Sequence, residues 1–140
     1  MPSVVDYITP GKITGAKGGL ICLSPRDTNY ELHLVGAYDG PLNARVNAVV
    51  RAKARKVWTV PTGGNFVTPI FGTPRIVQGR IRAINGNLVV IRCGLDVIVE
   101  LPESDDALDL AHGGLSVGAM VNATLQPGAT FELAPAPTAV

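Results

Sequence analysis

Polar and apolar side chains alternate with a period of two along several short stretches of this 140-residue chain. Arg80 and Arg82 flank Ile81 in one stretch, and Asn122 lies between Val121 and Ala123 in another. Because successive side chains of a strand point to opposite faces, this alternation is typical of strands with one buried face. Glycine and proline separate the stretches, as turn residues do. The pattern predicts an all-β protein.

The second half of the chain divides into five predicted strands. Asn85-Gly86 is a hairpin signal, because both residues tolerate a positive φ. Ser104 followed by two aspartates is typical of a helix start, and Gly113-Gly114 of a helix end, so we expect a short helix over 105–111. The predicted strands cover about 79–84, 87–93, 96–101, 116–125 and 129–134.

The first half repeats this order, which indicates an internal duplication. Residues 11–23 match residues 79–91 at a constant offset of 68. A strand over 30–34 then matches one over 97–101, and a short loop replaces the helix. The alternative is that any two meanders share glycine turns and Val/Ile alternation. The matched positions are Gly11/Gly79, Ile13/Ile81, Gly18/Gly86, Leu20/Leu88, Val46-Asn47-Ala48/Val121-Asn122-Ala123, Trp58/Phe131 and Val60/Leu133.

Three meandering strands, a short connection and two closing strands resemble the five-stranded OB-fold. The G-x-I…G-x-L…V-G-x-x-V-x-A pattern of residues 79–123 also resembles the tandem TOBE barrels of oxyanion-binding proteins. The resemblance implies two tandem barrels in residues 1–60 and 79–134, and it suggests a small anion as ligand. Residues 61–78 would be a packed Pro/Gly-rich linker, and residues 135–140 a tail. One pseudo-twofold barrel built from two interleaved halves is the structural alternative.

Composition and the lengths of apolar runs indicate the environment in which the protein is expected to work. Hydrophobic residues make up 46% of the chain and charged residues only 16%, below the ~25% of an average soluble domain, so we expect much of the surface to be covered. No apolar run approaches the ~18–20 residues that cross a bilayer, and the first residues lack a signal-peptide pattern, so we expect a cytoplasmic protein without a membrane partner. Cys22 and Cys93 are expected to be reduced.

No group of residues forms a recognisable catalytic centre. His33 alternates with leucines on a strand, and His112 ends the predicted helix, where a cation favours the dipole. The glycine-rich residues 11–19 lack the Gly-Lys-Ser/Thr ending of a phosphate loop. No Cys/His cluster has zinc spacing, and the aspartates fit no calcium loop. We therefore predict a protein that is not an enzyme and that holds no cofactor or metal.

The strongest polar signal is a run of cations between residues 45 and 58. In an extended strand Arg51, Lys53 and Arg55 share one face at ~7 Å spacing. Such a row, with Trp58 nearby, could follow a nucleic-acid backbone and stack a base. A net charge of only +1 favours a solvated or subunit-facing strand instead. The candidate binding residues are Arg45, Arg51, Lys53, Arg55, Lys56 and Trp58.

Charge is divided between the halves. Residues 1–70 hold eight Lys/Arg and four Asp/Glu, a balance of +4, whereas residues 71–140 hold four and seven, a balance of −3. Opposite patches favour docking within one chain or contact between identical chains. We therefore expect a structural protein that self-associates as a homo-oligomer, and a binding module for single-stranded nucleic acid or a small anion is the alternative. The candidate contact residues are Phe66, Phe71, Glu103, Asp105, Asp106 and Asp109.

Overall fold

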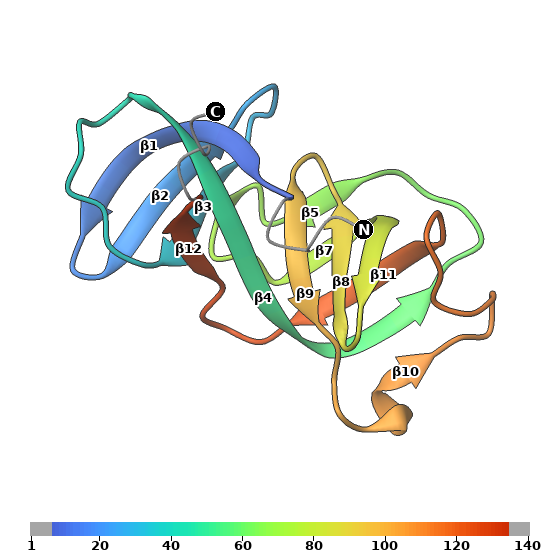
Figure 1. Ribbon diagram of the computed structural model, residues 1–140. Helices are drawn as coiled ribbons and strands as arrows, with labels where there is room; N and C mark the ends of the chain where they lie inside the picture. Colours follow the sequence, from blue (N-terminus) through green and yellow to red (C-terminus); the bar gives the residue numbers. More distant parts are fainter. Residues whose placement is uncertain (1–6, 135–140) are drawn as a thin grey trace, which may run out of the picture.

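The computed structural model describes residues 7–134, and the regular structure there consists of strands and one 3-10 turn (Figure 1). The all-β prediction is confirmed. The predicted tail, 135–140, and the first six residues lie outside the described range. The strands are β1 (Thr9–Lys17), β2 (Leu20–Pro25), β3 (Glu31–Val35), β4 (Arg45–Thr59), β5 (Phe66–Thr68), β6 (Phe71–Gly72), β7 (Ile76–Asn85), β8 (Leu88–Arg92), β9 (Asp96–Glu100), β10 (Leu108–Asp109), β11 (Met120–Leu125) and β12 (Thr130–Leu133), and the turn η2 is Asp105–Ala107.

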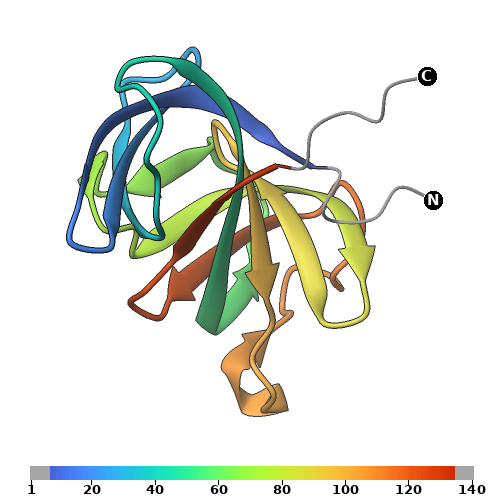
Figure 2. The same ribbon diagram turned by 60° about the vertical axis from the view of Figure 1, so that its left-hand side comes forward.

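These strands form one large mixed sheet whose pairings close into two circuits that share β4. The first circuit runs β1-β2-β3-β12-β4 and returns to β1. The second runs β7-β8-β9-β4-β11 and returns to β7. Each circuit contains one parallel pair, β3–β12 or β4–β9. Figures 1 and 2 show the two circuits as two lobes of the molecule, with β4 crossing diagonally between them.

The strands that close the circuits are exchanged along the chain. β4 pairs with β1 over residues 45–48 and with β11 over residues 54–59, so it continues from the first circuit into the second. β12 follows β11 in sequence, yet it pairs with β3 and β4 in the first circuit. A tandem arrangement would keep each last strand in its own circuit. The structure differs because no glycine or proline interrupts residues 45–59, and the strand therefore does not turn back.

The β1–β2 and β7–β8 hairpins have the same register at the offset of 68 found in the sequence. Each hairpin also contains an irregularity at the same position, where Thr14 of β1 and Arg82 of β7 have no partner in the ladder. An extra residue bends a strand and increases its twist. Both hairpins therefore curve at matching points.

The second hairpin turns one residue later than predicted. Asn85 is the last residue of β7 and pairs with Leu88, so the turn residues are Gly86 and Asn87. Gly86 has φ 61°, whereas Asn87 does not have a positive φ. A positive φ at the first turn position alone is the type II′ arrangement, for which glycine is preferred there. Glycine, and not Asn85, therefore sets this turn.

The helix predicted over 105–111 is wrong beyond its first turn. Ser104 caps the three-residue turn η2 by accepting a hydrogen bond from the backbone N of Asp106. The chain then becomes extended, and β10 pairs in parallel with Val57 and Trp58 of β4. Leu108 packs against the main core. Pairing with the free edge of β4 therefore replaces the hydrogen bonds that a longer helix would have made.

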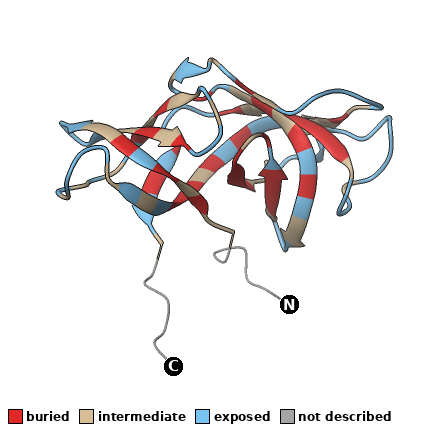
Figure 3. Ribbon diagram, turned by 90° about the horizontal axis from the view of Figure 1, so that it is seen from above, coloured by how far each residue is buried: buried red, intermediate tan, exposed pale blue. Residues whose placement is uncertain are grey.

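Two apolar clusters hold the sheet together. The main cluster lies inside the circuits and includes Ile13, Leu34 and Ile91, all fully buried. A second cluster joins Val49, Val90 and Ile98 of β4, β8 and β9 on the opposite face of those strands. Figure 3 shows alternating buried and exposed bands along the strands, as the sequence pattern predicts. Linker strand β5 also contributes to the main cluster, through Val67.

Replacing Gly79 by alanine should destabilise the fold by about 1–3 kcal/mol or more, the usual cost of overpacking. A Cβ there would collide with the backbone carbonyl of Arg92 on β8, with the carbonyl carbon at 2.6 Å. Gly114→Ala is the matched control, because an added Cβ there would have no heavy atom within 4 Å beyond its chain neighbours. Urea unfolding of both variants tests this. Equal midpoints would show that β7 and β8 are not packed so closely.

Candidate functional site

The predicted basic residues lie along β4, but two of them are already compensated by carboxylates. Arg51 Nε lies 3.1 Å from Oε1 of Glu132 on β12. Lys53 Nζ lies 4.0 Å from Oε2 of Glu100 on β9. Both pairs join the basic first half of the sequence to the acidic second half. Part of the charge complementarity seen in the sequence is therefore used within one chain.

Arg55, Lys56 and Trp58 lie beyond these pairs, at the end of β4. The β4–β11 register shifts between Ala54 and Lys56, so Arg55 is an extra residue there. As a result Arg55 and Lys56 are both exposed, although they are adjacent. Trp58 is half-buried and lies opposite Asn122, whereas Phe131, its sequence counterpart, is buried opposite Val50. Since Asn122 takes the place of Asn47, whose neighbour on β12 is Ala134, Trp58 and Phe131 occupy different positions of the two ladders.

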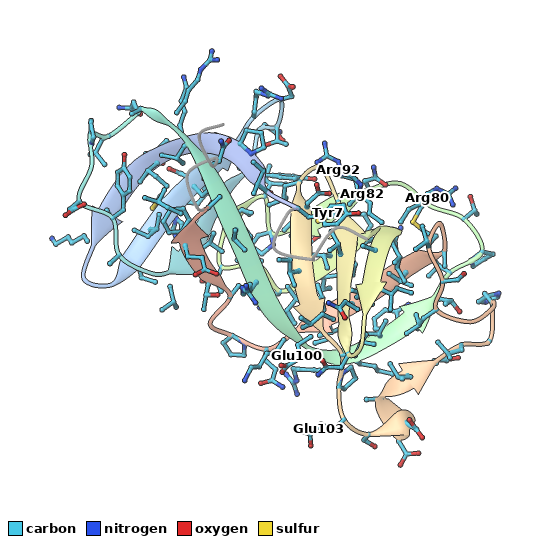
Figure 4. The ribbon with its side chains drawn as sticks, in the orientation of Figure 1. Tyr7, Arg80, Arg82, Arg92, Glu100 and Glu103 are labelled. Carbon is cyan, nitrogen blue, oxygen red and sulfur yellow. The ribbon has the colours of Figure 1, made fainter. Side chains whose placement is uncertain are left out.

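The acidic candidates lie beside this end of β4. Asp105 and Asp106 form the first turn of η2, and Glu103 precedes it (Figure 4). Asp109 is in β10, where it pairs with Trp58, and its Oδ1 accepts a hydrogen bond of 3.1 Å from the backbone N of Ala111. All four carboxylates belong to exposed residues. The acidic connection and the basic end of β4 are therefore neighbours in one chain.

The two linker aromatics have different surroundings. Phe66 of β5 is half-buried and pairs with Gln78 of β7. Phe71 of β6 is 64% exposed, and its ring meets the ring of His33 edge to face at 5.3 Å between centroids. His33 pairs with Cys22 across the β2–β3 ladder. Phe71 therefore extends the outward face of β2 and β3.

A hollow of about 480 Å³, which the sequence did not reveal, lies on the outward face of β1 between the end of β2 and the start of β4. Lys12 of β1 lies directly opposite Arg45 of β4 and opposite Ser24 of β2. The hollow is lined by Pro10, Gly11, Lys12, Ser24, Pro25, Arg26, Asp27, Thr28, Arg45, Val46 and Asn47. Of the predicted binding residues, only Arg45 lies here. Lys12 could be identified only through strand register, which the sequence does not state.

Further cations continue from this hollow towards the second lobe. A smaller hollow of about 100 Å³ shares Arg26 and Asp27 with the first and is also lined by Arg92 of β8. Arg82 of β7 lies beyond, with its guanidinium 5.2 Å from the centre of the Tyr7 ring. Figure 4 shows Arg92, Arg82, Tyr7 and Arg80 along one end of this lobe. The period-two spacing of Arg80 and Arg82 was the sequence signal for this group.

Asp96, at the start of β9, is the buried anion of this region. Its Oδ2 accepts a 2.7 Å hydrogen bond from Nη1 of Arg82, whereas its Oδ1 is buried without a hydrogen-bond partner among residues 7–134, 3.7 Å from Nη1 of Arg92. Thr9 of β1 donates its hydroxyl proton to the Asp96 carbonyl (3.0 Å) and accepts from the Asp96 N–H (3.2 Å). Asp96 therefore connects the two circuits.

Both cysteines are free, and neither has the environment of a nucleophile. Burial raises the pKa of the Cys93 thiol to about 12, so the thiol stays protonated at neutral pH. Burial, and secondarily the nearby Glu31, also raises the pKa of Cys22. A reactive cysteine has a lowered pKa instead. Both thiols therefore lack the lowered pKa that is typical of a reactive cysteine.

Comparison with protein-family models finds no match, and comparison with curated proteins finds no similar sequence. Within residues 7–134, no three His, Cys, Asp or Glu side chains are grouped to hold a metal ion. The same part of the chain contains no helix of the length and apolar character needed to cross a membrane. The geometry of the surfaces is therefore the basis for inferring function.

Removing Arg82 should destabilise the fold, because the buried Asp96 carboxylate loses its hydrogen-bond donor. We expect Arg82→Ala to lower the free energy of unfolding by about 1–3 kcal/mol, the usual penalty of an unsatisfied buried polar group. Arg75→Ala is the control, because Arg75 is exposed just before β7. Urea unfolding in an Asp96→Asn background completes the test, since Arg82→Ala should cost little there. An equal loss in both backgrounds would contradict the role given to Asp96.

Proposed function

We propose that this protein is a non-enzymatic structural or interaction protein, built from two duplicated OB-like units, that self-associates through its β-surfaces. The duplication is supported by ladders that match pair by pair. The β8–β9 register repeats that of β2–β3, so that Asp96 takes the place of Glu31. In that place Glu31 accepts a 2.8 Å hydrogen bond from Thr14, as Asp96 does from Arg82.

The OB-like character is supported by strand order. Around each circuit, three successive antiparallel strands are followed by a strand that is parallel to the third and then by a strand that pairs with the first. This is the order expected of a five-stranded Greek-key barrel. The exchange of closing strands makes the two units inseparable. It brings the arrangement nearer to the interleaved alternative than to independent tandem barrels.

Self-association is supported above all by an exposed apolar surface on β2, β3 and β6. Leu20 and Val35 lie opposite each other there, and both are almost half exposed. Phe71 and Ile70 of the linker lie at the other end of β3, where Phe71 pairs with Glu31, and the His33–Cys22 pair separates the two ends. Exposed apolar side chains gathered on one face are typical of protein–protein contacts. A second copy of the chain would cover them, which fits the low charge of the sequence.

Opposite charges at the other end of the sheet give a second contact surface. Arg55 and Lys56 are exposed and have no carboxylate within 4.0 Å among the described residues. The exposed acidic connection around Asp105 and Asp106 lies nearby. Head-to-tail contact between copies would pair these groups, and such pairs are weakened by salt. The apolar surface would be much less sensitive to salt.

Light scattering at micromolar concentration, in low and high salt, tests self-association. We expect an oligomer in low salt and expect Phe71→Asp to shift the mass towards the monomer, because it places a charge in the apolar contact. Val117→Asp is the matched control, since Val117 is 66% exposed but lies in the β10–β11 connection. A monomeric wild-type protein in both salts would refute the proposal, and equal masses of the two variants would refute this surface.

A binding module for single-stranded nucleic acid or a small anion is the second candidate. It is supported by Arg55 and Lys56, which are exposed and unpaired in the described part of the chain, and by the half-exposed ring of Trp58 beside them. Cationic grooves with stacking aromatics bind single strands without sequence preference. This candidate needs no enzyme chemistry and shares the OB-like scaffold.

Fluorescence anisotropy with a mixed-sequence oligonucleotide tests the second candidate. We expect Arg55→Glu plus Lys56→Glu to weaken binding at least about tenfold and to reduce its salt dependence, because fewer counterions are released. Lys17→Glu plus Arg75→Glu makes the same charge change elsewhere. Equal weakening by both pairs would show a nonspecific charge effect, and no weakening would exclude this patch.

A further inference from the structure

The hollow on β1 combines polar and charged side chains with the apolar groups of two prolines and Val46, over a floor of backbone. Lys12, Ser24 and Asn47 point outward from β1, β2 and β4, since each alternates with a buried or half-buried neighbour along its strand. The floor is formed by Gly11, where an added Cβ would lie only 2.6 Å from the Ser24 carbonyl oxygen. A volume of about 480 Å³ is within the usual range of small-molecule sites.

Two cations at this hollow oppose each other without compensation. Lys12 and Arg45 are direct partners in the antiparallel β1–β4 ladder, and both are exposed on the same face. Like charges directly opposite in a ladder are unfavourable. Within residues 7–134, no carboxylate lies within 4.0 Å of either cation, unlike Arg51 or Lys53 on the same β4 strand. An anion bound between them would remove the repulsion.

The loop after β2 holds a third cation at the hollow, Arg26, whose Nε lies 3.8 Å from Oδ2 of the exposed Asp27 beside it. The backbone N of Arg26 donates to the Pro10 carbonyl (2.9 Å), which ties the loop to β1. Thr28 donates its hydroxyl proton to the Pro25 carbonyl (2.8 Å) and accepts from the Tyr30 N–H (3.2 Å). These bonds fix the backbone that carries Arg26 and Asp27. The site is therefore built into the fold and does not depend on a long free side chain alone.

The corresponding place on the second lobe is filled by the chain itself. By register, Asn122 and Gln78 take the places of Asn47 and Pro10. Asn122 donates to Gln78 (3.0 Å), and Gln78 donates to the carbonyl of Gly64 in the linker (3.0 Å). Arg80, in the place of Lys12, donates to the Gly118 carbonyl (2.8 Å). Among residues 7–134, Asn122 Oδ1 alone lacks a hydrogen-bond partner in this group of the second lobe, whereas the side chains of Lys12, Arg45 and Asn47 form no hydrogen bond with any of these residues.

We propose that this hollow binds a phosphate ester whose organic part carries hydroxyl groups. Lys12, Arg26 and Arg45 would hold the phosphate, because guanidinium and ammonium groups make short, charge-assisted hydrogen bonds to its oxygens. Ser24 and Asn47 add neutral donors, and the Asp27 carboxylate would accept from a ligand hydroxyl. The inference deepens the small-anion alternative of the second proposed function and rests on it.

Calorimetric titration of the full chain with ribose 5-phosphate, with ribose and with inorganic phosphate tests the site. We expect saturable binding of ribose 5-phosphate, weaker binding of phosphate and none of ribose. Lys12→Ala plus Arg45→Ala should weaken ribose 5-phosphate at least about tenfold. Lys17→Ala plus Arg75→Ala, the same charge change on residues outside the hollow, should leave affinity unchanged. The Lys12→Ala plus Arg45→Ala variant should remain folded, because the substitutions remove the repulsion between the two cations.

Three results would overturn the proposal. Ribose 5-phosphate could bind no more tightly than ribose, or the two double variants could bind it equally well. The third is binding of a mixed-sequence oligonucleotide that needs Lys12 and Arg45, with no binding of ribose 5-phosphate, which would assign the surface to nucleic acid. An oligonucleotide that binds through Arg55 and Lys56 would leave the second proposed function standing without this site. If no phosphate compound binds, both fall together.

Discussion

Strand β4 is paired along almost its whole length with β11 and β12, which run antiparallel to it one after the other. Val121 pairs with Thr59 at one end of this ribbon, and Leu133 pairs with Ala48 at the other. Each half of the ribbon closes one circuit of strands. Neither lobe can therefore complete its core without a strand from the other half of the sequence, and the sheet is expected to fold as one cooperative unit.

The two lobes share their ladders but differ in what lies over them. Matching irregularities at Thr14 and Arg82 bend both hairpins, and matching acids accept hydrogen bonds from these two residues. The linker and the β10–β11 connection then cover one end of the second lobe, through Gly64 and Gly118. The corresponding end of the first lobe stays open. Proteins of this kind acquire function through such local differences and not through the scaffold.

Charge compensation separates structural cations from available ones. Arg51 and Arg82 hydrogen-bond to carboxylates of other strands and help to join segments that are distant in sequence. Lys12 and Arg45 face each other, and their mutual repulsion favours an anion between them. The same distinction applies to apolar groups, since Val67 is buried in the main core whereas Phe71 of the same linker is exposed. Composition alone does not distinguish a paired cation from an unpaired one, or a buried apolar residue from an exposed one.

Period-two alternation was enough to predict the all-β class, and the offset of 68 anticipated the matching hairpins, because hairpins depend on residues close in sequence. Two local predictions were wrong. The turn of the second hairpin lies one residue later than predicted, at Gly86, and most of the helix predicted over 105–111 is replaced by β10, which pairs with the distant strand β4. The exchange of closing strands and the Lys12–Arg45 pair depended on which distant strands became neighbours. The lack of glycine and proline in residues 45–59 is a local signal for a continuous β4, but the partners of that strand are decided by the burial of whole strand faces, which no local pattern of residues records.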